Sequence, residues 1–550
     1  MQRPTGVRWQ VRVSDTAMGL LVAVGGVSTI IALLLVVAVL LWTTLALLKP
    51  SRIGSWSQVD VPGYWVSSVD ESGQLYWGVT KRGKVELWAL ADSGEPLHVI
   101  EAPDFFATPT CFALSEDRDL LVVGCEDGSV VSGRIKLEDE FVSMQDAPVD
   151  LALAGNRKVS IHDGKIFVKF EDSGLRKIGL DDWTWSAPQK VASGRICAID
   201  IEQMEPSILL GVEESTRVLT LCQVESGDFE LAMTTLDATQ GGLPSFSEEK
   251  ADLRLNIRGH GRAEDFVHCS LLPDSAQILV AWQSGTIDRY SIGLDSLQYQ
   301  ESQSTGTALV SASALSGRQA ILCGTTDGRL IGWTVAKRNA LETADPSFGR
   351  IEDELLANDP FQLVLHHELK ISDSPIHSVA SSSNSKTVAA LDRAGKLQLA
   401  YVTTDSLLAD SRVPTDEVGG NCELSFSSNN SELLLVSEEG TWVCPLELEH
   451  PDASTEAYFS TTWYEGYDRP NYIWQSSAGS DYSETKLSLI PLFFGTLKAT
   501  IFTMLFSVPL AIFAAIYTSE FMGPVLRSRI RPLLELMASL PAVVIGYLFA

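Results

Sequence analysis

The stretch LCGTTDGRLIGW, residues 322–333, holds two short β-prone runs joined by a Thr-Asp-Gly turn. Glycine in such a turn supplies the positive φ that a tight hairpin needs. Three more stretches have this form, residues 77–88, 123–131 and 280–290, and weaker copies surround Asp163-Gly164, Ala394-Gly395 and Glu439-Gly440. This repeated pattern therefore predicts a series of β-hairpins along the chain.

The spacing of these turns indicates how the hairpins are arranged. The intervals between turn glycines are 45 residues from 83 to 128, 43 from 285 to 328 and 45 from 395 to 440. A four-stranded propeller blade takes about 40–45 residues. Counting the turns predicts an all-β propeller of about seven blades, with eight as the alternative, over residues 53–455.

An aromatic residue follows the turn glycine by five positions in three copies, at Trp88, Tyr290 and Trp333. With Gly259-His260 placed 30 residues before Tyr290, these copies resemble WD40-type blades. The pattern is degenerate, because no Asp follows the three aromatics.

Two longer intervals interrupt the repeat, at 337–373 and 235–261. Both are expected to be loops or excursions on one face of the propeller. Loops of this kind commonly bind partners.

The charge of the chain is unevenly distributed. The net charge is −29, yet residues 1–52 hold five basic residues and one acidic residue, and residues 486–550 hold five and two. The whole acidic excess therefore lies in the middle of the chain. Nucleic-acid binding needs basic patches, so this composition argues against that class.

The N-terminal end predicts a membrane anchor. No charged residue occurs between Asp15 and Lys49, and about 20 apolar residues suffice to span a bilayer. We therefore expect a cytoplasmic N-terminus at 1–17 and a first transmembrane helix at 18–48. A secretory signal peptide is the alternative, although no small-residue cleavage site follows the apolar run.

The C-terminal end predicts further membrane segments. An interfacial segment and a second transmembrane helix are expected over 487–519, a cytoplasmic loop over 520–531, and the start of a third helix over 532–550. Because the last apolar run stops after 15 uncharged residues, we expect the sequence to be part of a longer membrane protein; a short re-entrant segment is the alternative.

Basic flanks predict the orientation of these segments. Positive residues favour the cytoplasmic side of a membrane. The topology-determining residues are Arg3, Arg8 and Arg12 before the first span and Arg527, Arg529 and Arg531 after the second. With two crossings between the clusters, the acidic middle is expected in the periplasm of a bacterium, outside the inner membrane.

An aromatic juxtamembrane linker is expected at 456–486. Its rings fit a headgroup boundary, and a final propeller strand is the other interpretation. The aromatics are Tyr458, Trp463, Tyr464, Tyr467, Tyr472, Trp474 and Tyr482.

Catalytic and metal-binding motifs are not apparent in the sequence. The eight cysteines form no C-x-x-C pair and are interpreted as small buried residues of strands, with a disulfide network as the alternative. His366-His367 with His377 could suggest a metal, but adjacent strand residues point to opposite faces. We expect no cofactor, no metal and no enzymatic activity.

The C-terminal 65 residues carry a family resemblance. The stretches PLFFGTL (491–497), VPLAIFAAIYTSE (508–520) and RPLLELMASLPAVVIG (531–546) resemble the first part of the membrane domain of type I ABC importer permeases. They are most similar to the PstC-like phosphate permeases, some of which carry a large periplasmic insert. YIWQSS at 472–477 looks like the end of that insert.

This resemblance implies a permease subunit for inorganic phosphate. It implies as partners a second permease subunit, cytoplasmic ATPase subunits that hydrolyse ATP, and a periplasmic phosphate-binding protein. Glu535 is a weak candidate for the substrate pathway, and a structural pairing with Arg531 is the alternative. The propeller would then dock a partner or regulate transport.

Two other functions compete with this interpretation. A membrane-anchored propeller that acts as an interaction scaffold would explain the acidic repeat domain without transport. A quinoprotein-like propeller enzyme would need a cofactor site, and none is visible in the sequence.

Overall fold

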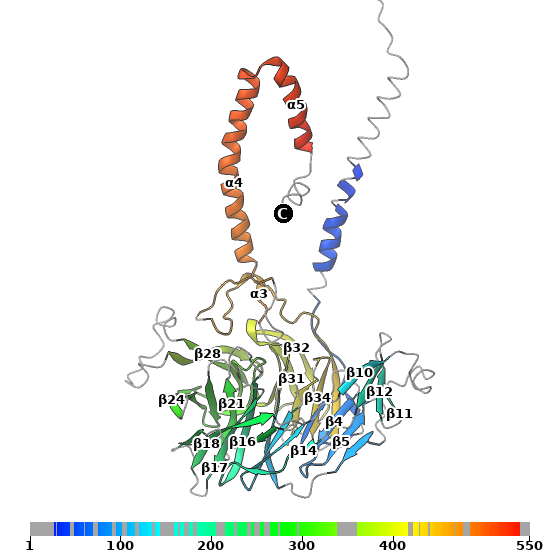
Figure 1. Ribbon diagram of the computed structural model, residues 1–550, viewed down its shortest axis with the longest axis vertical. Coiled ribbons are helices and arrows are strands. Elements are labelled where there is room, and N and C mark those ends of the chain that lie inside the picture. Colours follow the sequence, from blue (N-terminus) through cyan, green and yellow to red (C-terminus); the bar gives the residue numbers. More distant parts are fainter. Residues whose placement is uncertain are drawn as a thin grey trace, which may run out of the picture.

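A ring of β-sheets forms most of the computed structural model of this chain, and helices extend from one end of the ring (Figure 1). The described residues run from 27 to 539, apart from single residues and short gaps and the longer stretches 45–48, 70–74, 91–94, 102–106, 116–119, 143–158, 170–174, 180–183, 205–214, 239–243, 247–252, 258–264, 338–359 and 477–483.

Seven sheets make the ring, so the predicted propeller is confirmed with seven blades. In each blade we name the strands A to D from the central channel outward. Blade 1 contains β3 (Val66–Val69), β4 (Leu75–Val79), β5 (Val85–Ala89) and β6 (His98–Ile100). Blade 2 contains β7 (Pro109–Leu114), β8 (Leu120–Cys125), β9 (Ser129–Arg134), β14 (Thr184–Trp185) and β15 (Gln189–Lys190). Blade 3 contains β16 (Arg195–Met204), β17 (Ser215–Gln223), β18 (Phe229–Ala238), β19 (Pro244–Phe246) and β20 (Leu253–Ile257).

The remaining blades follow in chain order. Blade 4 contains β21 (Phe266–Leu272), β22 (Gln277–Trp282), β23 (Thr286–Ile292) and β24 (Leu297–Ser304), and blade 5 contains β25 (Leu309–Ala314), β26 (Ala320–Thr325), β27 (Arg329–Lys337) and β28 (Phe361–Lys370). Blade 6 contains β29 (Ile376–Ser381), β30 (Thr387–Asp392), β31 (Lys396–Tyr401) and β32 (Ser406–Arg412). Blade 7 contains β33 (Glu423–Phe426), β34 (Glu432–Ser437) and β35 (Gly440–Glu447), with β1 (Arg52–Ile53) and β2 (Ser57–Val59) as its outer strand.

An eighth sheet lies outside the ring. It contains β10 (Glu138–Val142), β11 (Val159–His162), β12 (Lys165–Lys169) and β13 (Leu175–Gly179), between strands C and D of blade 2. Blade 2 contacts blade 3 directly, because Thr110 Oγ1 on β7 donates a 2.6 Å hydrogen bond to the carbonyl of Ile196 on β16. The extra sheet is therefore an insertion and not an eighth blade.

The two ends of the domain meet in blade 7. Residues 52–59 pair antiparallel with β35, with Arg52 opposite Glu447 and Ser57 opposite Val443. The chain segment that follows the N-terminal apolar region thus supplies the outer strand of the last blade. This pairing closes the ring, because the N-terminal and C-terminal parts of the domain share one blade.

The turn glycines adopt the conformation that the sequence predicts. Gly83, Gly128, Gly285, Gly328 and Gly395 have φ between 79° and 88°. In each of these B–C turns the glycine N–H donates to the carbonyl three residues earlier, as in Gly285 to Trp282 at 3.0 Å. The weak copy at 163–164 lies outside the described residues.

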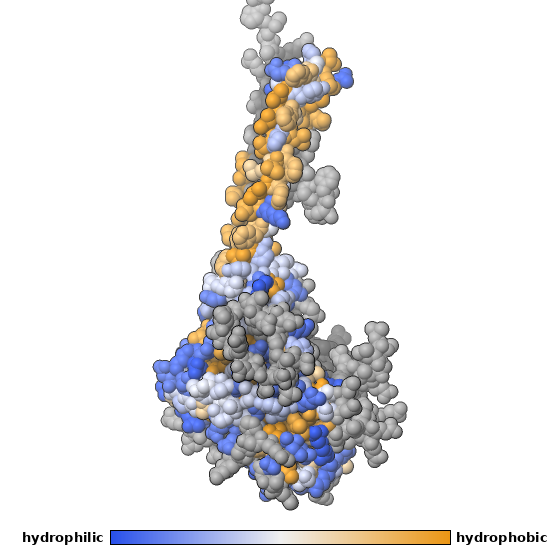
Figure 2. Space-filling model, turned by 90° about the vertical axis from the view of Figure 1, so that its left-hand side faces the viewer, coloured by the Kyte–Doolittle hydropathy of each residue, from blue (hydrophilic) through white to orange (hydrophobic). Residues whose placement is uncertain are grey.

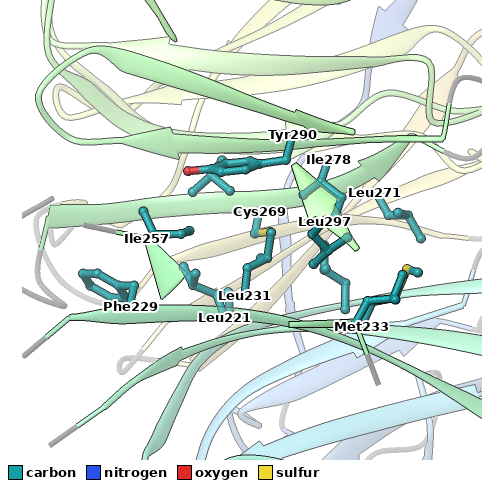
Figure 3. Close-up of a cluster of buried hydrophobic side chains, with 14 of the residues drawn as sticks. Leu221, Phe229, Leu231, Met233, Ile257, Cys269, Leu271, Ile278, Tyr290 and Leu297 are labelled. Carbon is teal, nitrogen blue, oxygen red and sulfur yellow. The ribbon is translucent and has the colours of Figure 1, made fainter. Parts of the chain in front are cut away.

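Buried apolar residues from neighbouring blades form the core. In the cluster between blades 3 and 4, Leu221, Phe229 and Leu231 face Cys269, Ile278 and Tyr290 (Figure 3). The predicted aromatics Trp88, Tyr290 and Trp333 are all buried. Each blade covers the apolar face of the next, which is why the ring needs every blade.

One charged contact is buried between blades 4 and 5. Arg289, fully buried on β23, donates from Nε to Glu301 at 2.6 Å and from Nη2 to the carbonyl of Phe361 at 3.2 Å. The N–H of Leu363 donates to the same Glu301 oxygen at 2.7 Å. These bonds attach the start of β28 to blade 4.

The cysteines fit the predicted interpretation as small residues of the strands. None of the eight, all within the described residues, forms a disulfide, and six are buried. Burial raises the pKa of Cys111, Cys222 and Cys323 to about 12. Because the thiolate is the reactive form, these thiols are protected both by burial and by their pKa.

We expect maleimide to modify the six buried cysteines only after denaturation, when mass spectrometry should count eight adducts. Cys197, which is half-buried, is expected to react first under native conditions, because the pKa of the other half-buried thiol, Cys111, is raised to about 12. Rapid native labelling of Cys323 would contradict the packing described for blade 5.

The helices extend from one end of the propeller. The C-terminal part contains α3 (Thr455–Phe459), α4 (Ile490–Ile516), a π-helical turn (Tyr517–Phe521) and α5 (Pro524–Ser539). In the described part of the chain, only 490–521 is long and apolar enough to cross a membrane. Its side chains are exposed and form an apolar band (Figure 2).

The other predicted spans are described only in part. A shorter apolar helix covers 30–44, within the predicted first span, while residues 1–26 and 540–550 lie outside the described residues. α5 begins at Pro524, inside the stretch expected to be a loop, and carries Arg527, Arg529 and Arg531. Of the three predicted transmembrane helices, the structure thus describes only one that is long and apolar enough to cross a membrane, and the predicted multi-pass topology stays a prediction.

Candidate functional site

The two ends of the propeller channel carry different loops. The A–B and C–D turns form the helix-bearing end, where residues 485–490 lead into α4 (Figure 1). The B–C turns and the D–A connections form the distal end. The apolar helices at 30–44 and 490–516 are therefore both connected to the helix-bearing end, and the distal end points away from them.

The long excursions belong to the helix-bearing end. The inserted sheet, residues 239–252 and residues 338–359 all connect strands C and D of their blades. The sequence predicts that the two long intervals lie on one face, and their attachment points share one end of the ring.

A buried ion pair joins the propeller to the juxtamembrane linker. Lys386, in the A–B turn of blade 6, pairs with Glu465 of the linker at 2.5 Å, and their side chains are only 3% and 6% exposed. Lys386 also donates to the carbonyl of Ser316 in blade 5. Burial is the main reason why the pKa of Glu465 is raised to about 7, with Lys386 opposing the shift and Glu484 adding to it.

A second carboxylate extends this contact. The N–H of Glu465 donates to Glu484 at 2.6 Å, and the hydroxyl of Thr403 donates to the other Glu484 oxygen at 2.7 Å. Thr403 lies in the 3-10 turn Val402–Thr404 at the C–D end of blade 6. The linker is thus attached to blades 5 and 6 directly before α4 begins.

Two adjacent histidines lie beside this contact. The expectation that their rings point to opposite faces is wrong, because β28 has a bulge at His366 and the ring centroids of His366 and His367 are 4.0 Å apart. His366 packs edge-on against Trp463 at 5.0 Å, and His367 Nδ1 lies 2.9 Å from Asp405. Burial lowers the pKa of His366 to about 2.

These histidines do not form a metal site with His377. Within the described residues, no group of three His, Cys, Asp or Glu side chains is arranged to hold a metal. The pair instead belongs to the packing of the linker on the propeller.

The linker aromatics are divided between two environments. Tyr464 is 1% exposed and packs on the propeller, whereas Tyr467, Tyr472 and Trp474 are each about 40% exposed. The linker adds no strand to a blade in its described residues; it contains α3 and two isolated β-bridges. Tyr482 lies outside the described residues.

The propeller channel contains two connected spaces. The inner space, about 230 Å³, is lined by serines of the inner strands together with Glu423 and Arg318. The outer space, about 610 Å³, opens between blades 7 and 1 at the distal end and is lined by Trp65, Lys81 and Glu423. Phe112 and Glu423 line both spaces.

An arginine that lines the inner space links blades 5 and 3. Arg318, in the A–B turn of blade 5, donates to Asp200 and to the carbonyl of Ile201 in blade 3. Asp200 also accepts from the N–H of Leu271 in blade 4 at 2.7 Å. This bridge joins the A–B turn of blade 5 to the inner strand of blade 3, past blade 4.

Of the predicted site residues, those that the structure describes lie on α5, outside both places. Glu535 lies on α5, four residues after Arg531, and its side chain is outside the described residues. Arg527 donates to the carbonyl of Met522 at 3.3 Å. Arg3, Arg8 and Arg12 lie outside the described residues.

Comparison with known proteins supports no closer assignment. No protein-family model matches the sequence, and a comparison with curated proteins gives no match. One similar solved structure is the β-propeller domain of Cps50 (Swd1) from Myceliophteria thermophila, with 11% identity, a TM-score of 0.41 and coverage of 71% of this chain and 99% of that chain.

Another similar structure is that of U3-55K, with 13% identity, a TM-score of 0.36 and coverage of 72% of this chain and 98% of that chain. The assignment of seven blades rests on the strand pairing of this chain.

Sequence reasoning did not find Lys386, Glu465, Arg318 or Glu423. Each is a single charged residue in a turn, in the linker or at a strand start, where charge is normally solvated. Of these four, only Glu465 has a sequence context that indicates burial, because it lies between the aromatic residues Tyr464 and Tyr467, which pack on one another.

Proposed function

We propose that this chain is a membrane-anchored β-propeller that acts as an interaction module. The observation that carries this proposal is that both membrane-directed segments leave from one end of the ring. The distal end, with its open channel, is then presented to partners in the compartment that the propeller occupies.

The construction of the domain supports this proposal. Loops at one end of a rigid scaffold are common binding sites. At the distal end, the B–C turns present pairs of exposed residues before each buried glycine, such as Gln283 and Ser284 or Arg393 and Ala394. At the other end, the buried linker contact holds the propeller on its membrane stalk.

Site-specific photo-crosslinking in intact cells tests this function. A photoreactive residue at Ser284, Thr326 or Arg393 is expected to give discrete protein adducts. The same residue at Tyr299 or Leu407, which are exposed on outer strands β24 and β32, provides the control. Equal adducts from both sets, or no adducts from the distal set, would contradict the proposal.

The sequence favours a second, more specific candidate. The motifs at 491–497, 508–520 and 531–546 support a permease subunit of an ABC importer for inorganic phosphate. The chain itself would not be an enzyme, since separate ATPase subunits would hydrolyse ATP. A second permease subunit and a periplasmic phosphate-binding protein would complete the transporter.

Phosphate uptake tests this candidate. A strain that lacks its phosphate permease is complemented with the full-length protein, and uptake of labelled phosphate is measured beside labelled sulfate as a control anion. Restored uptake of phosphate alone is expected. If uptake stays at the level of the empty vector, only the interaction module remains.

A further inference from the structure

We propose that the pocket between blades 6 and 7, at the helix-bearing end, binds the primary ammonium group of an ethanolamine headgroup. The place of the pocket favours a phospholipid as the source of that headgroup, and this part of the inference rests on the proposed membrane anchoring. A free ethanolamine phosphate ester would offer the same chemistry.

The first step of the argument is the place of the pocket. Its volume is about 620 Å³, and its wall includes the exposed residues Glu449 and Thr485. Thr485 lies five residues before α4 begins, and both carboxylate oxygens of Glu449 accept from Lys49 Nζ at 3.0 Å. The apolar helix 30–44 ends five residues before Lys49. A phospholipid beside these helices would therefore bring its headgroup to the pocket (Figure 1).

The second step is a buried hydroxyl that faces the pocket. Thr387 is 0% exposed, and its Oγ1 makes no hydrogen bond with the residues that the structure describes. Alternate residues of a strand share a face, and Ala389 and Leu391 belong to one buried cluster with Leu424 of blade 7. Thr387 is therefore turned toward blade 7, into the pocket that it lines. An unsatisfied hydroxyl gains from a ligand that brings N–H donors.

The third step is the charge of the pocket. Three acids line it, Glu447, Glu449 and Asp452. Lys386 is the one basic residue among the described lining residues, and its ammonium is 3% exposed and already paired with Glu465. Lys49 pairs with Glu449, which leaves two carboxylates without an ion pair in the described part of the chain. The ligand that balances this charge is a cation.

The fourth step is the kind of cation. The other polar side chains of the wall are amides and hydroxyls, such as Asn429, Ser431 and Thr485. Their oxygens accept N–H donors, which a trimethylammonium group lacks. A quaternary ammonium group is held instead by aromatic faces, and Tyr401 is the single aromatic residue among the described lining residues. The pocket is therefore expected to bind an ethanolamine headgroup and to reject a choline headgroup.

Titration with two short-chain lipids tests the proposal. The full chain in detergent is titrated with dihexanoyl phosphatidylethanolamine and, as the matched control, with dihexanoyl phosphatidylcholine, and native mass spectrometry measures the adducts. The ethanolamine lipid is expected to bind at least about tenfold more tightly than the choline lipid. Equal binding of the two, or no adduct of the ethanolamine lipid at millimolar concentration, would overturn the proposal.

An isosteric variant tests the buried hydroxyl. Thr387→Val is expected to weaken binding of the ethanolamine lipid about tenfold. The same variant should unfold at the same temperature as the parent chain or at a higher one, because it removes a buried hydroxyl that has no partner. A merely structural hydroxyl would not give this combination. Unchanged binding in Thr387→Val would overturn the role of this residue.

A pair of charge variants locates the site independently. Asp452→Asn, which changes a half-buried acid of the pocket, is expected to weaken binding of the ethanolamine lipid about fivefold. Asp410→Asn, which changes an exposed acid on the outer strand β32 of blade 6, should leave binding unchanged. An equal loss in both variants, or none in Asp452→Asn, would overturn the assignment. Thermal unfolding checks that both variants are folded.

A third ligand decides the source of the headgroup. If glycerophosphoethanolamine, which has no acyl chains, binds at least as tightly as the lipid, the site takes a free ethanolamine ester. If the lipid binds more tightly, the site takes a phospholipid.

Membrane anchoring is tested separately from the pocket. The chain should enter nanodiscs made of phosphatidylcholine alone, because the apolar helices and not the pocket drive insertion. Failure to enter them would contradict the proposed anchoring. Entry into nanodiscs, together with equal binding of the two short-chain lipids, would overturn only the pocket.

Discussion

Replacing Lys386 with methionine is expected to destabilise the contact between the propeller and the 456–486 linker by about 3–5 kcal/mol. The substitution keeps the volume of the side chain but leaves Glu465 buried without its cation. Chemical denaturation in detergent, followed by tryptophan fluorescence, measures the loss, and limited proteolysis of residues 455–489 detects release of the linker.

The loss should depend on pH in a defined direction. Burial raises the pKa of Glu465 above that of an unfolded glutamate, so its contribution to folding becomes less favourable as pH rises from about 4.5 through 7. Without Lys386 the pKa rises further. The variant is therefore expected to lose more stability at pH 8 than at pH 5.5.

Two further variants identify the cause. Lys386→Met combined with Glu465→Gln removes both charges and is expected to recover most of the loss. Lys49→Met breaks the ion pair with Glu449 at the same end, whose side chains are 60% and 54% exposed, and should cost no more than about 1 kcal/mol. If Lys49→Met and Lys386→Met cost the same, burial is not the cause.

Replacing Gly285 with alanine is expected to destabilise the propeller by about 3 kcal/mol. Its φ of 88° is unfavourable for a residue with a side chain, and an added Cβ would lie 2.2 Å from the carbonyl oxygen of Thr307. That carbonyl belongs to the connection into blade 5, so the clash separates two blades. Urea denaturation measures the loss.

Gly306 provides a matched control in the same connection. Its φ is 74°, but an added Cβ would meet no atom within 4 Å. Gly306→Ala is therefore expected to lower the free energy of unfolding only by the cost of holding alanine at a positive φ, about 1–2 kcal/mol. If the two variants lose the same stability, backbone conformation alone explains the glycine at 285, and the close approach of the blades does not.

The difference between local backbone conformation and contacts between blades also explains how much of the fold could be predicted from the sequence. The B–C turns are local: a glycine at the end of each turn, followed by an alternating strand, sets the hairpin without help from distant residues. Their 43–45-residue period and turn motifs therefore predicted six of the seven blades; the copy at 163–164 lies between β11 and β12 of the inserted sheet, and blade 3 carries no such motif. The inserted sheet in blade 2 was not predicted, because its strands form hairpins of the same local kind and only pairing separates them from the ring.

The histidine pair shows where local periodicity fails. Alternation places residues 366 and 367 on opposite faces of β28. A bulge opposite Gly332 and Trp333 brings the rings together, and it forms because that strand must fit its neighbour and the linker. A pattern of single residues does not contain this information.

The sequence by itself determined the blade repeat, the positive-φ turns and the apolar segment that becomes α4, because each depends on neighbours along the chain. Only the tertiary structure decided that the N-terminal strand closes blade 7 and that Lys386 meets Glu465. It also decided that Arg318 bridges blades 5 and 3. These features join residues far apart in the chain, such as Arg52 and Glu447, and the Lys386–Glu465 pair depends on burial that only the folded domain creates.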